Sequence, residues 1–201
     1  MYNLKAEGRD QTIKAKQLRR KGIIPALIYG RSLKESILIQ IPLADANRLL
    51  STVSKGNTLN IETEGKTYNV LLKEIVRAPI SQQVEHIDFQ YLIANEAVNS
   101  VIKVILTNRD KNENPIQQHI EEIPYHALPK DFVQEVVIDV EGMEPGSSVK
   151  IEDLDIAKNE NIRITIPEDT VIVNVAELKR VVEETADTEA NTETDTEANK
   201  E

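Results

Sequence analysis

Residues 18–30 read LRRKGIIPALIYG, and this change from a cationic to an apolar stretch decides the fold of the first half of the chain. The apolar part, Ile23 to Tyr29, has the length of a buried strand and ends at Gly30. Gly22 suits the C-cap of a helix over residues 12–21, because glycine readily adopts the left-handed conformation that often ends a helix. The stretch therefore predicts a short basic helix that leads directly into a buried strand.

Apolar and polar residues alternate in several further stretches of the first 92 residues, which is the pattern of half-buried strands. A second helix is expected over residues 42–54, because proline suits a first helical position and leucines recur on one face. Glu64-Gly65-Lys66 is a compact hairpin connection. The expected strands are residues 2–6, 23–29, 37–41, 58–63, 67–76 and 84–91. Five or six strands and two short helices in residues 1–92 predict a small β-barrel domain.

The rest of the chain divides into a second domain and a tail. Strand-like stretches separated by turn signals predict a β-rich domain over residues 93–180, with residues 92–100 as the junction. Residues 181–201 are an expected disordered acidic tail, because beyond Val182 no large apolar residue is present to offset the entropy cost of ordering. The expected strands of the second domain are residues 101–106, 120–127, 133–140, 161–166 and 171–175. The fold as a whole is therefore expected to be mainly β.

The formal net charge of −10 hides an uneven distribution. Residues 1–92 hold 14 Lys/Arg against 9 Asp/Glu, a net charge of +5, and residues 1–34 hold 9 against 2, a net charge of +7. Residues 93–180 hold 9 against 17 and residues 181–201 hold 1 against 8, net charges of −8 and −7. Because a phosphate backbone responds to the local basic patch, the first domain is the candidate for nucleic-acid binding.

Composition and motifs argue against several other classes of protein. No apolar stretch approaches the ~20 residues of a membrane span, no signal segment is seen, and cysteine is absent, so we expect a soluble cytoplasmic protein. The motifs of phosphate-binding loops, dinucleotide-binding folds and serine hydrolases are missing, so neither an enzyme nor a cofactor is expected. His119 and His126 lie seven apart on an expected strand and face opposite sides, which argues against a metal site.

The basic segment supplies the first candidate binding residues, Arg9, Lys14, Lys16, Arg19 and Arg20. On a helix, Lys16, Arg19 and Arg20 are spaced i, i+3 and i+4 and form one cationic face. The planar guanidinium of arginine can donate two hydrogen bonds to one phosphate, whereas lysine provides a mobile point charge. The segment is therefore interpreted as a phosphate-binding surface.

Three further candidates lie on expected strands. His86 and Asp88 are two residues apart, so both face the side opposite Ile87 and Phe89. An imidazole and a carboxylate on an exposed strand can hydrogen-bond to base edges and to 2′-hydroxyls of RNA. The same pair also serves purely structural, metal-binding or acid–base roles in proteins. Tyr29, at the end of its strand, is either a core residue or a group that stacks on a base or donates to a phosphate or ribose hydroxyl.

Two anchor motifs, LRRKGIIPALIYG at 18–30 and HIDF at 86–89, together with Leu72-Lys73-Glu74, resemble ribosomal protein twenty-five of the bacterial large subunit, in the long two-domain form called Ctc. The resemblance covers nearly all of residues 1–178. It implies an N-terminal β-barrel that binds the loop E region of 5S rRNA, and a β-rich C-terminal domain on the ribosome surface.

The family's RNA-contacting positions carry over to six residues of this chain, and two departures are evident. Val76 stands where relatives often have glutamine. The turn over residues 108–114 lacks the glycines that are common in relatives, so this loop is expected to differ in shape. The six matching residues are Arg9, Lys14, Arg20, Tyr29, His86 and Asp88.

The leading hypothesis is a non-catalytic structural protein of the large ribosomal subunit. Its expected partners are 5S rRNA, neighbouring large-subunit rRNA and ribosomal proteins, and it is expected to be a monomer within the cytoplasmic ribosome. The alternative is a protein-interaction module that works through the acidic second domain. A hydrolase centred on His86 and Asp88 ranks third, because this domain offers no second histidine and no nucleophile at a recognisable spacing.

Overall fold

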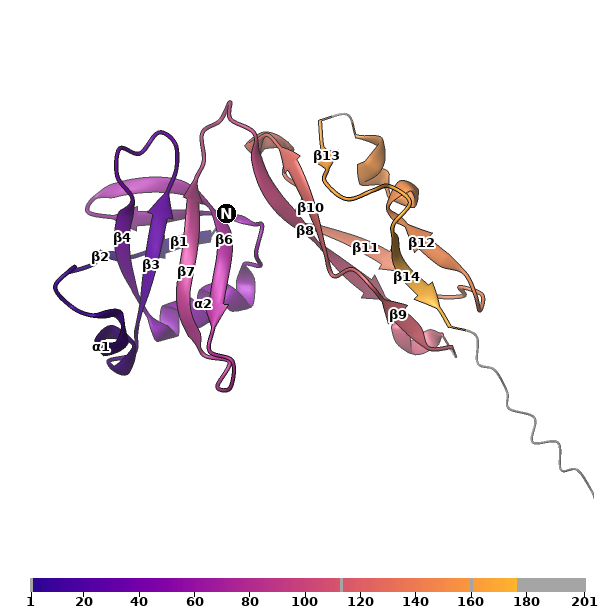
Figure 1. Cartoon of the computed structure of the whole chain (residues 1–201), viewed down its shortest axis with the longest axis horizontal. Coiled ribbons are helices and arrows are strands. Elements are labelled where there is room, and N and C mark those ends of the chain that lie inside the picture. The colour runs from indigo at the N-terminus through magenta and orange to yellow at the C-terminus, as the bar shows by residue number, and fades with distance from the viewer. Residues whose placement is uncertain (1, 113, 160, 177–201) are drawn as a thin grey trace, which may run out of the picture.

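The computed structural model describes residues 2–112, 114–159 and 161–176. Strands dominate it, and the expected mainly β fold with a barrel-like first domain and a second β domain is confirmed (Figure 1). The tail expected over residues 181–201 lies outside the described residues. The elements of the first domain are β1 (Tyr2–Lys5), β2 (Glu7–Gly8), α1 (Ala15–Arg20), β3 (Ile23–Tyr29), β4 (Ile37–Pro42), α2 (Leu43–Thr52), β5 (Thr58–Thr63), β6 (Lys66–Arg77) and β7 (Val84–Tyr91).

The seven strands of the first domain form one sheet in the order β1-β5-β6-β7-β3-β4-β2. Its two edge strands, β1 and β2, are consecutive in the chain and are separated only by Ala6. The Ala6 amide still donates to the Glu62 carbonyl at 2.9 Å, next to β1, whereas the Arg9 amide donates to the Leu38 carbonyl at 3.0 Å, on β4. The N-terminal segment therefore pairs with both edges in turn and nearly closes the sheet into a barrel.

Alternation along the strands fills the inside of this barrel. Ile24, Ala26 and Ile28 of β3 point inward and are at most 2% exposed, as are Ile87 and Phe89 of β7. The parallel register of β3 and β7 places these side chains in one core. Residues at the alternate positions consequently face outward.

The connection between β5 and β6 has the form expected of a two-residue hairpin. Glu64 and Gly65 have φ values of 51° and 73°, so both central residues are left-handed, as a type I′ turn requires. The predicted strands on either side are confirmed, with β6 one residue longer at each end than expected.

Both predicted helices are present, but α1 is shorter than the expected residues 12–21. Asp10 accepts hydrogen bonds from the amide and the hydroxyl of Thr12 at 2.8 and 2.7 Å, which holds the chain in a turn, and Lys14 is still extended. Gly22, with φ of 72°, ends the helix as predicted, and its amide donates to the Arg19 carbonyl at 3.0 Å. Leu18, only 2% exposed, anchors α1 to the barrel.

The second domain consists of a four-stranded sheet, β11-β8-β10-β13, and a three-stranded sheet, β12-β14-β9, around one core. Its central side chain is Tyr125, which is fully buried and packs edge-to-face on Phe132, with ring centroids 6.0 Å apart. The strands are β8 (Val98–Thr107), β9 (Ile116–Gln118), β10 (Glu122–Ala127), β11 (Glu135–Asp139), β12 (Ser148–Lys150), β13 (Arg163–Ile164) and β14 (Val171–Val175).

Sequence patterning was least accurate in this domain. β8 begins at Val98, inside the stretch interpreted as a junction, and β13 contains only two of the residues 161–166 expected to be a strand. The strands β9 and β12 were not predicted, since three residues are too few to show a period. Within the described residues, four 3₁₀ turns connect the strands: Arg109–Lys111, Pro129–Asp131, Ile151–Asp153 and Asp155–Lys158. The turn signal over residues 128–131 coincides with the second of them.

The two domains meet through a small apolar cluster and several polar contacts. The cluster consists of Leu71, Leu92 and Val98, with Phe132 packed against it. Around it, Lys73 Nζ donates to the Asn99 carbonyl at 2.9 Å, Ser100 Oγ donates to the Gly56 carbonyl at 3.0 Å, and Lys55 Nζ pairs with Glu122 Oε2 at 2.9 Å. The domains are thus joined by specific contacts as well as by the chain.

Gly56 is the tightest point of this junction. It has φ of 86°, and a Cβ atom at this position would collide with the carbonyl oxygen of Val101. Gly56→Ala should therefore add an overpacking cost of about 1–3 kcal/mol to the strain of a left-handed alanine, and should loosen the contact between the domains. Thermal unfolding measures the first effect, and small-angle scattering measures the second as a larger radius of gyration.

Gly65→Ala is the matched control for this variant. Gly65 has a similar φ of 73°, but a Cβ atom there meets nothing within 4 Å. This variant should show only the left-handed strain, about 1–2 kcal/mol, with an unchanged radius of gyration. Equal effects of the two substitutions would mean that the domains do not approach each other at Gly56.

Candidate nucleic-acid interface

The outer face of β7 carries His86 and Asp88, because Ile87 and Phe89 between and beside them are buried in the barrel. The register places Tyr29 of β3 opposite Gln90, two residues from Asp88, and places Val76 of β6 opposite His86. These side chains therefore share one face of the barrel, as the two-residue spacing of His86 and Asp88 predicts.

His86 and Asp88 are coupled through one edge of the imidazole. Nδ1 of His86 lies 2.7 Å from the carbonyl oxygen of Pro25, and since a carbonyl only accepts, Nδ1 must carry the hydrogen. Nε2 lies 3.0 Å from Oδ1 of Asp88. When Nε2 carries no hydrogen, Oδ1 is a buried acceptor without a hydrogen-bond partner among the described residues, and a proton on Nε2 turns the contact into an ion pair.

The two side chains are fixed yet accessible. Their exposed fractions are 33% for His86 and 25% for Asp88. The backbone of β3 holds the imidazole at Pro25, so that the ring cannot rotate away from the face without losing this bond. The pair thus presents a partly desolvated carboxylate whose orientation is set before any ligand arrives.

Tyr29 is half-buried at the end of β3. Burial, and then the negative charges of Asp88 and Glu74, raise the pKa of its phenol above the ordinary value. The hydroxyl therefore remains protonated at neutral pH and is a hydrogen-bond donor next to the His86–Asp88 pair. The sequence left open whether Tyr29 is a core residue or a ligand-contacting one. Its half-buried position on the face of His86 and Asp88 favours a hydroxyl donor over a core tyrosine.

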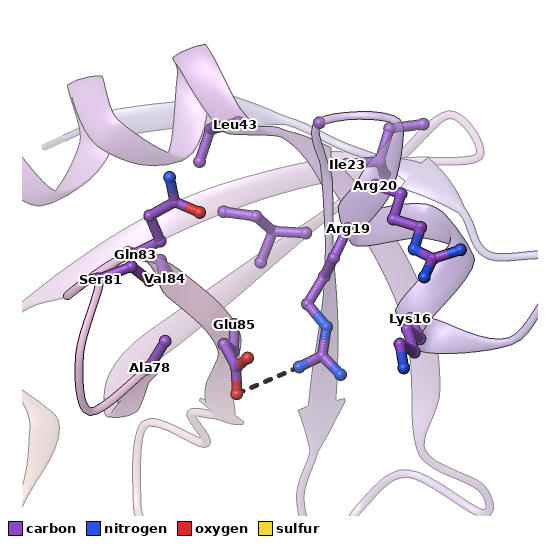
Figure 2. Close-up of a pocket in the computed structure, with 12 residues that line it drawn as sticks. Lys16, Arg19, Arg20, Ile23, Leu43, Ala78, Ser81, Gln83, Val84 and Glu85 are labelled. Atoms are coloured by element: carbon purple, nitrogen blue, oxygen red, sulfur yellow. Dashed lines mark ion pairs between the residues drawn. The ribbon is translucent and has the colours of Figure 1, made fainter.

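A groove of about 430 Å³ lies at the end of this face where β7 begins (Figure 2). Lys16, Arg19 and Arg20 of α1 line one side of it, which confirms that the helical spacing places the three cations together. Nη1 of Arg19 lies 3.3 Å from Oε2 of Glu85, and Figure 2 shows Arg20 directed away from this pair. Among the described residues, neither Lys16 nor Arg20 has a carboxylate within ion-pair distance.

Arg9 and Lys14 lie on the segment between β2 and α1. Arg9 is half-buried, its Nη2 donates to the Ile13 carbonyl at 3.4 Å, and its Nε is buried without a hydrogen-bond partner among the described residues. Lys14 is exposed and directly precedes α1. Neither touches Tyr29, His86 or Asp88 through any hydrogen bond or ion pair found in the described part of the chain.

Six of the eight predicted residues thus form a row rather than one pocket, and Arg9 and Lys14 lie outside it on the segment before α1. The cations of α1 lie where β7 begins, His86 and Asp88 follow along β7, and Tyr29 lies near its end. Six residues of a strand span about 20 Å, so the row has the length of several nucleotides. Sequence reasoning missed Glu85, because nothing in the sequence indicates that it pairs with an arginine 66 positions earlier.

Other kinds of site find no support in the described residues. No group of three or more His, Asp or Glu side chains there is arranged to hold a metal ion. His119 hydrogen-bonds Asn174 at 3.0 Å and His126 hydrogen-bonds Asn99 at 2.7 Å, each at a separate place. Within the described ranges, no helix has the length and apolar character needed to cross a bilayer.

Comparison with known proteins gives a consistent result over nearly the whole chain. Residues 4–89 match the Ribosomal L25p family, and residues 97–179 match the C-terminal domain of ribosomal protein TL5. A large ribosomal subunit protein bL25 from Dictyoglomus thermophilum is 33% identical over 94% of this chain and 96% of its own length. Proteins of the same name from Halothermothrix orenii and Finegoldia magna are 32% and 26% identical, each over 91% of this chain and over 85% and 89% of their own lengths.

The raised pKa of Tyr29 gives a direct test of the geometry around it. A difference titration at 295 nm between the parent protein and Tyr29→Phe should show Tyr29 ionising above the pH of an ordinary tyrosine. Asp88→Asn should lower this pKa part of the way, since burial is the larger cause. A Tyr29 that ionises like free tyrosine would contradict its placement beside Asp88.

The same shift fixes the sign of a pH effect on stability. Because the folded protein favours the protonated phenol, this contribution to stability is complete below the ordinary tyrosine pKa and is lost as the pH rises through the raised one. The free energy of unfolding should therefore fall more steeply at alkaline pH in the parent than in Tyr29→Phe.

Proposed function

The chain belongs to the L25 family of large-subunit ribosomal proteins, and from this premise we propose that its barrel domain binds 5S rRNA in the loop E region. Members of this family are structural proteins of the ribosome rather than enzymes. The observation that carries the proposal is the row of Tyr29, His86 and Asp88 on one exposed face, continued by the cations of α1.

The two ends of the row suit different parts of an RNA duplex. Lys16 and Arg20 provide cations for phosphates, which would supply most of the affinity and all of its salt dependence. Arg19 is partly occupied by Glu85 and contributes less net charge. Tyr29, His86 and Asp88 provide donors and acceptors for ribose hydroxyls and base edges, which would set the register on the RNA.

Asp88 is the most informative member of the row, because phosphates repel a carboxylate. Its Oδ1 is buried beside Nε2 of His86, so a ligand can reach only the exposed part of the carboxylate group. A base amino group or a 2′-hydroxyl can donate to a carboxylate, and both are displayed in the shallow minor groove of an RNA helix. Asp88 would therefore contact a base or a ribose. His86 would hold the Asp88 carboxylate in place and take part in the same contact.

The second domain and the cellular setting are part of the same proposal. With a net charge of −8 over residues 93–180, this domain is unsuited to phosphate binding and suits contacts with neighbouring ribosomal proteins. The chain would act as a monomer within the cytoplasmic ribosome.

Replacement of cations tests the phosphate contacts. Arg20→Ala and Lys14→Ala should each weaken binding of the full chain to 5S rRNA and reduce the slope of log K against log salt by about 1, because each removes one cation that pairs with a phosphate. Filter binding or fluorescence anisotropy over a salt series measures both quantities.

Arg48→Ala is the matched control, because Arg48 is an exposed arginine of the same domain on α2. This variant loses the same charge and should bind 5S rRNA nearly as the parent does. If Arg20→Ala and Lys14→Ala also bind like the parent at matched salt, the assigned surface is wrong. If the parent itself shows no preference for 5S rRNA over a duplex of equal length, the proposed function is wrong.

A further inference from the structure

The loop between β6 and β7 exposes an isoleucine almost completely. Ile80 is 98% exposed, compared with 56% for Val137 and 39% for Val76, the other large apolar side chains on the described surface. A single exposed apolar residue is common on protein surfaces, so exposure by itself assigns no role to Ile80. The hydrogen-bonded loop that carries Ile80, and the groove beside this loop, are what indicate a role.

The loop that carries Ile80 is held rigid by its own hydrogen bonds. The Ala78 amide donates to the Gln83 carbonyl at 2.8 Å, and the Gln82 amide donates to the Ala78 carbonyl at 2.9 Å. Nη1 of Arg77 donates to the Gln82 carbonyl at 3.2 Å, and Nε2 of Gln82 donates to the Pro79 carbonyl at 3.0 Å. These bonds hold the loop backbone in a defined turn, so less backbone entropy would be lost if a partner covered Ile80.

The same loop forms one side of the groove described above. Ala78, Ser81 and Gln83 line it opposite Lys16, Arg19 and Arg20, and Figure 1 shows α1 and the β6–β7 loop at the same end of the barrel. Figure 2 shows Ile23 beside Arg20 and Leu43 beyond Gln83, both at one end of the groove. The groove thus combines cations on one side, a hydroxyl and an amide on the other, and apolar groups at one end.

Three kinds of group in one groove match the three parts of a nucleotide chain. Phosphates pair with guanidinium and ammonium groups, ribose hydroxyls bond to hydroxyl and amide side chains, and the flat parts of sugar and base pack on apolar ones. Isoleucine is among the residues that proteins place against or between bases in distorted grooves. An acidic peptide would use the cations but has no equivalent need for the exposed Ile80.

The groove is also continuous with the face of His86 and Asp88. Glu85, which lines the groove, directly precedes His86 on β7, and Val76, opposite His86 on β6, lies two residues before Ala78, which also lines the groove. A ligand that covers the face therefore reaches the groove without leaving the protein surface.

We propose that the groove between α1 and residues 78–83 takes one strand of the sugar–phosphate backbone of the bound RNA, and that Ile80 packs against a ribose or base at its rim. This inference rests on the proposed RNA-binding function and adds a second contact region to it. The β6–β7 loop and α1 would then contact the RNA strand from opposite sides of the groove.

Substitution of Ile80 tests this contact in the full chain. Ile80→Ser should weaken binding to a 5S rRNA transcript by about tenfold at every salt concentration, the scale of a single well-packed apolar anchor, with an unchanged salt slope. Ile80→Leu should bind within about threefold of the parent, because it keeps the apolar volume. Val137→Ser, which removes an exposed valine from the second domain, should change nothing.

The absence of cysteine allows the position of the loop on the RNA to be mapped directly. Ser81→Cys labelled with an iron chelate should cleave the 5S rRNA at a few neighbouring riboses, whereas Ser51→Cys on the exposed side of α2 should give no cleavage above background. The cleaved riboses should lie on one strand and should lose their protection from free hydroxyl radicals in the Ile80→Ser complex.

The outcomes separate this inference from the function on which it rests. If the parent binds 5S rRNA and Ile80→Ser binds equally well, or if the label at position 81 cleaves nothing, the loop does not contact RNA and the groove proposal is overturned. If the parent does not bind 5S rRNA, the proposed function itself fails.

Discussion

The parallel pairing of β3 with β7 is the interaction on which the rest of the barrel domain depends. Within the single sheet it joins β3, β4 and β2 to β1, β5, β6 and β7, and it buries Ile28 against Phe89 in a common core. The same register brings Tyr29 next to Asp88 and brings the Pro25 carbonyl within 2.7 Å of His86. Stability and the candidate interface therefore rest on the same pair of strands.

The charged side chains follow the same row along β7 and α1. Glu85, an acidic group near the row, is paired with Arg19. Asp88 is partly buried, so that it accepts hydrogen bonds from donors but repels phosphates. A chain of net negative charge can in this way present a locally basic groove and a selective carboxylate side by side. The electrostatic argument for RNA binding is thus local and does not depend on the isoelectric point.

The junction between the domains adds a geometric constraint. Gly56 approaches the backbone of β8 so closely that only glycine can stand there, and Leu71, Leu92 and Val98 close the space beside it. A barrel held on RNA would therefore hold the second domain in a defined direction. The contacts are few, so the orientation depends on this glycine more than on any large buried surface.

The sequence by itself determined the elements with strong periodicity: the strands over Ile23–Tyr29 and Val84–Tyr91, the outward placement of His86 and Asp88, and the shared face of the cations in α1. Each of these follows from the period of a strand or a helix, which is a local property. The sequence did not predict the short strands β9 and β12, because three residues show no period. It also overestimated the length of α1, because a turn at Asp10 competes with the helix.

Only the tertiary structure decided that Tyr29 lies beside Asp88, that Glu85 pairs with Arg19, and that the Ile80 loop faces α1. These are contacts between residues about 60 positions apart. The alternating pattern decides which face of each strand is buried, but not which distant strands pair or which of their residues lie opposite each other.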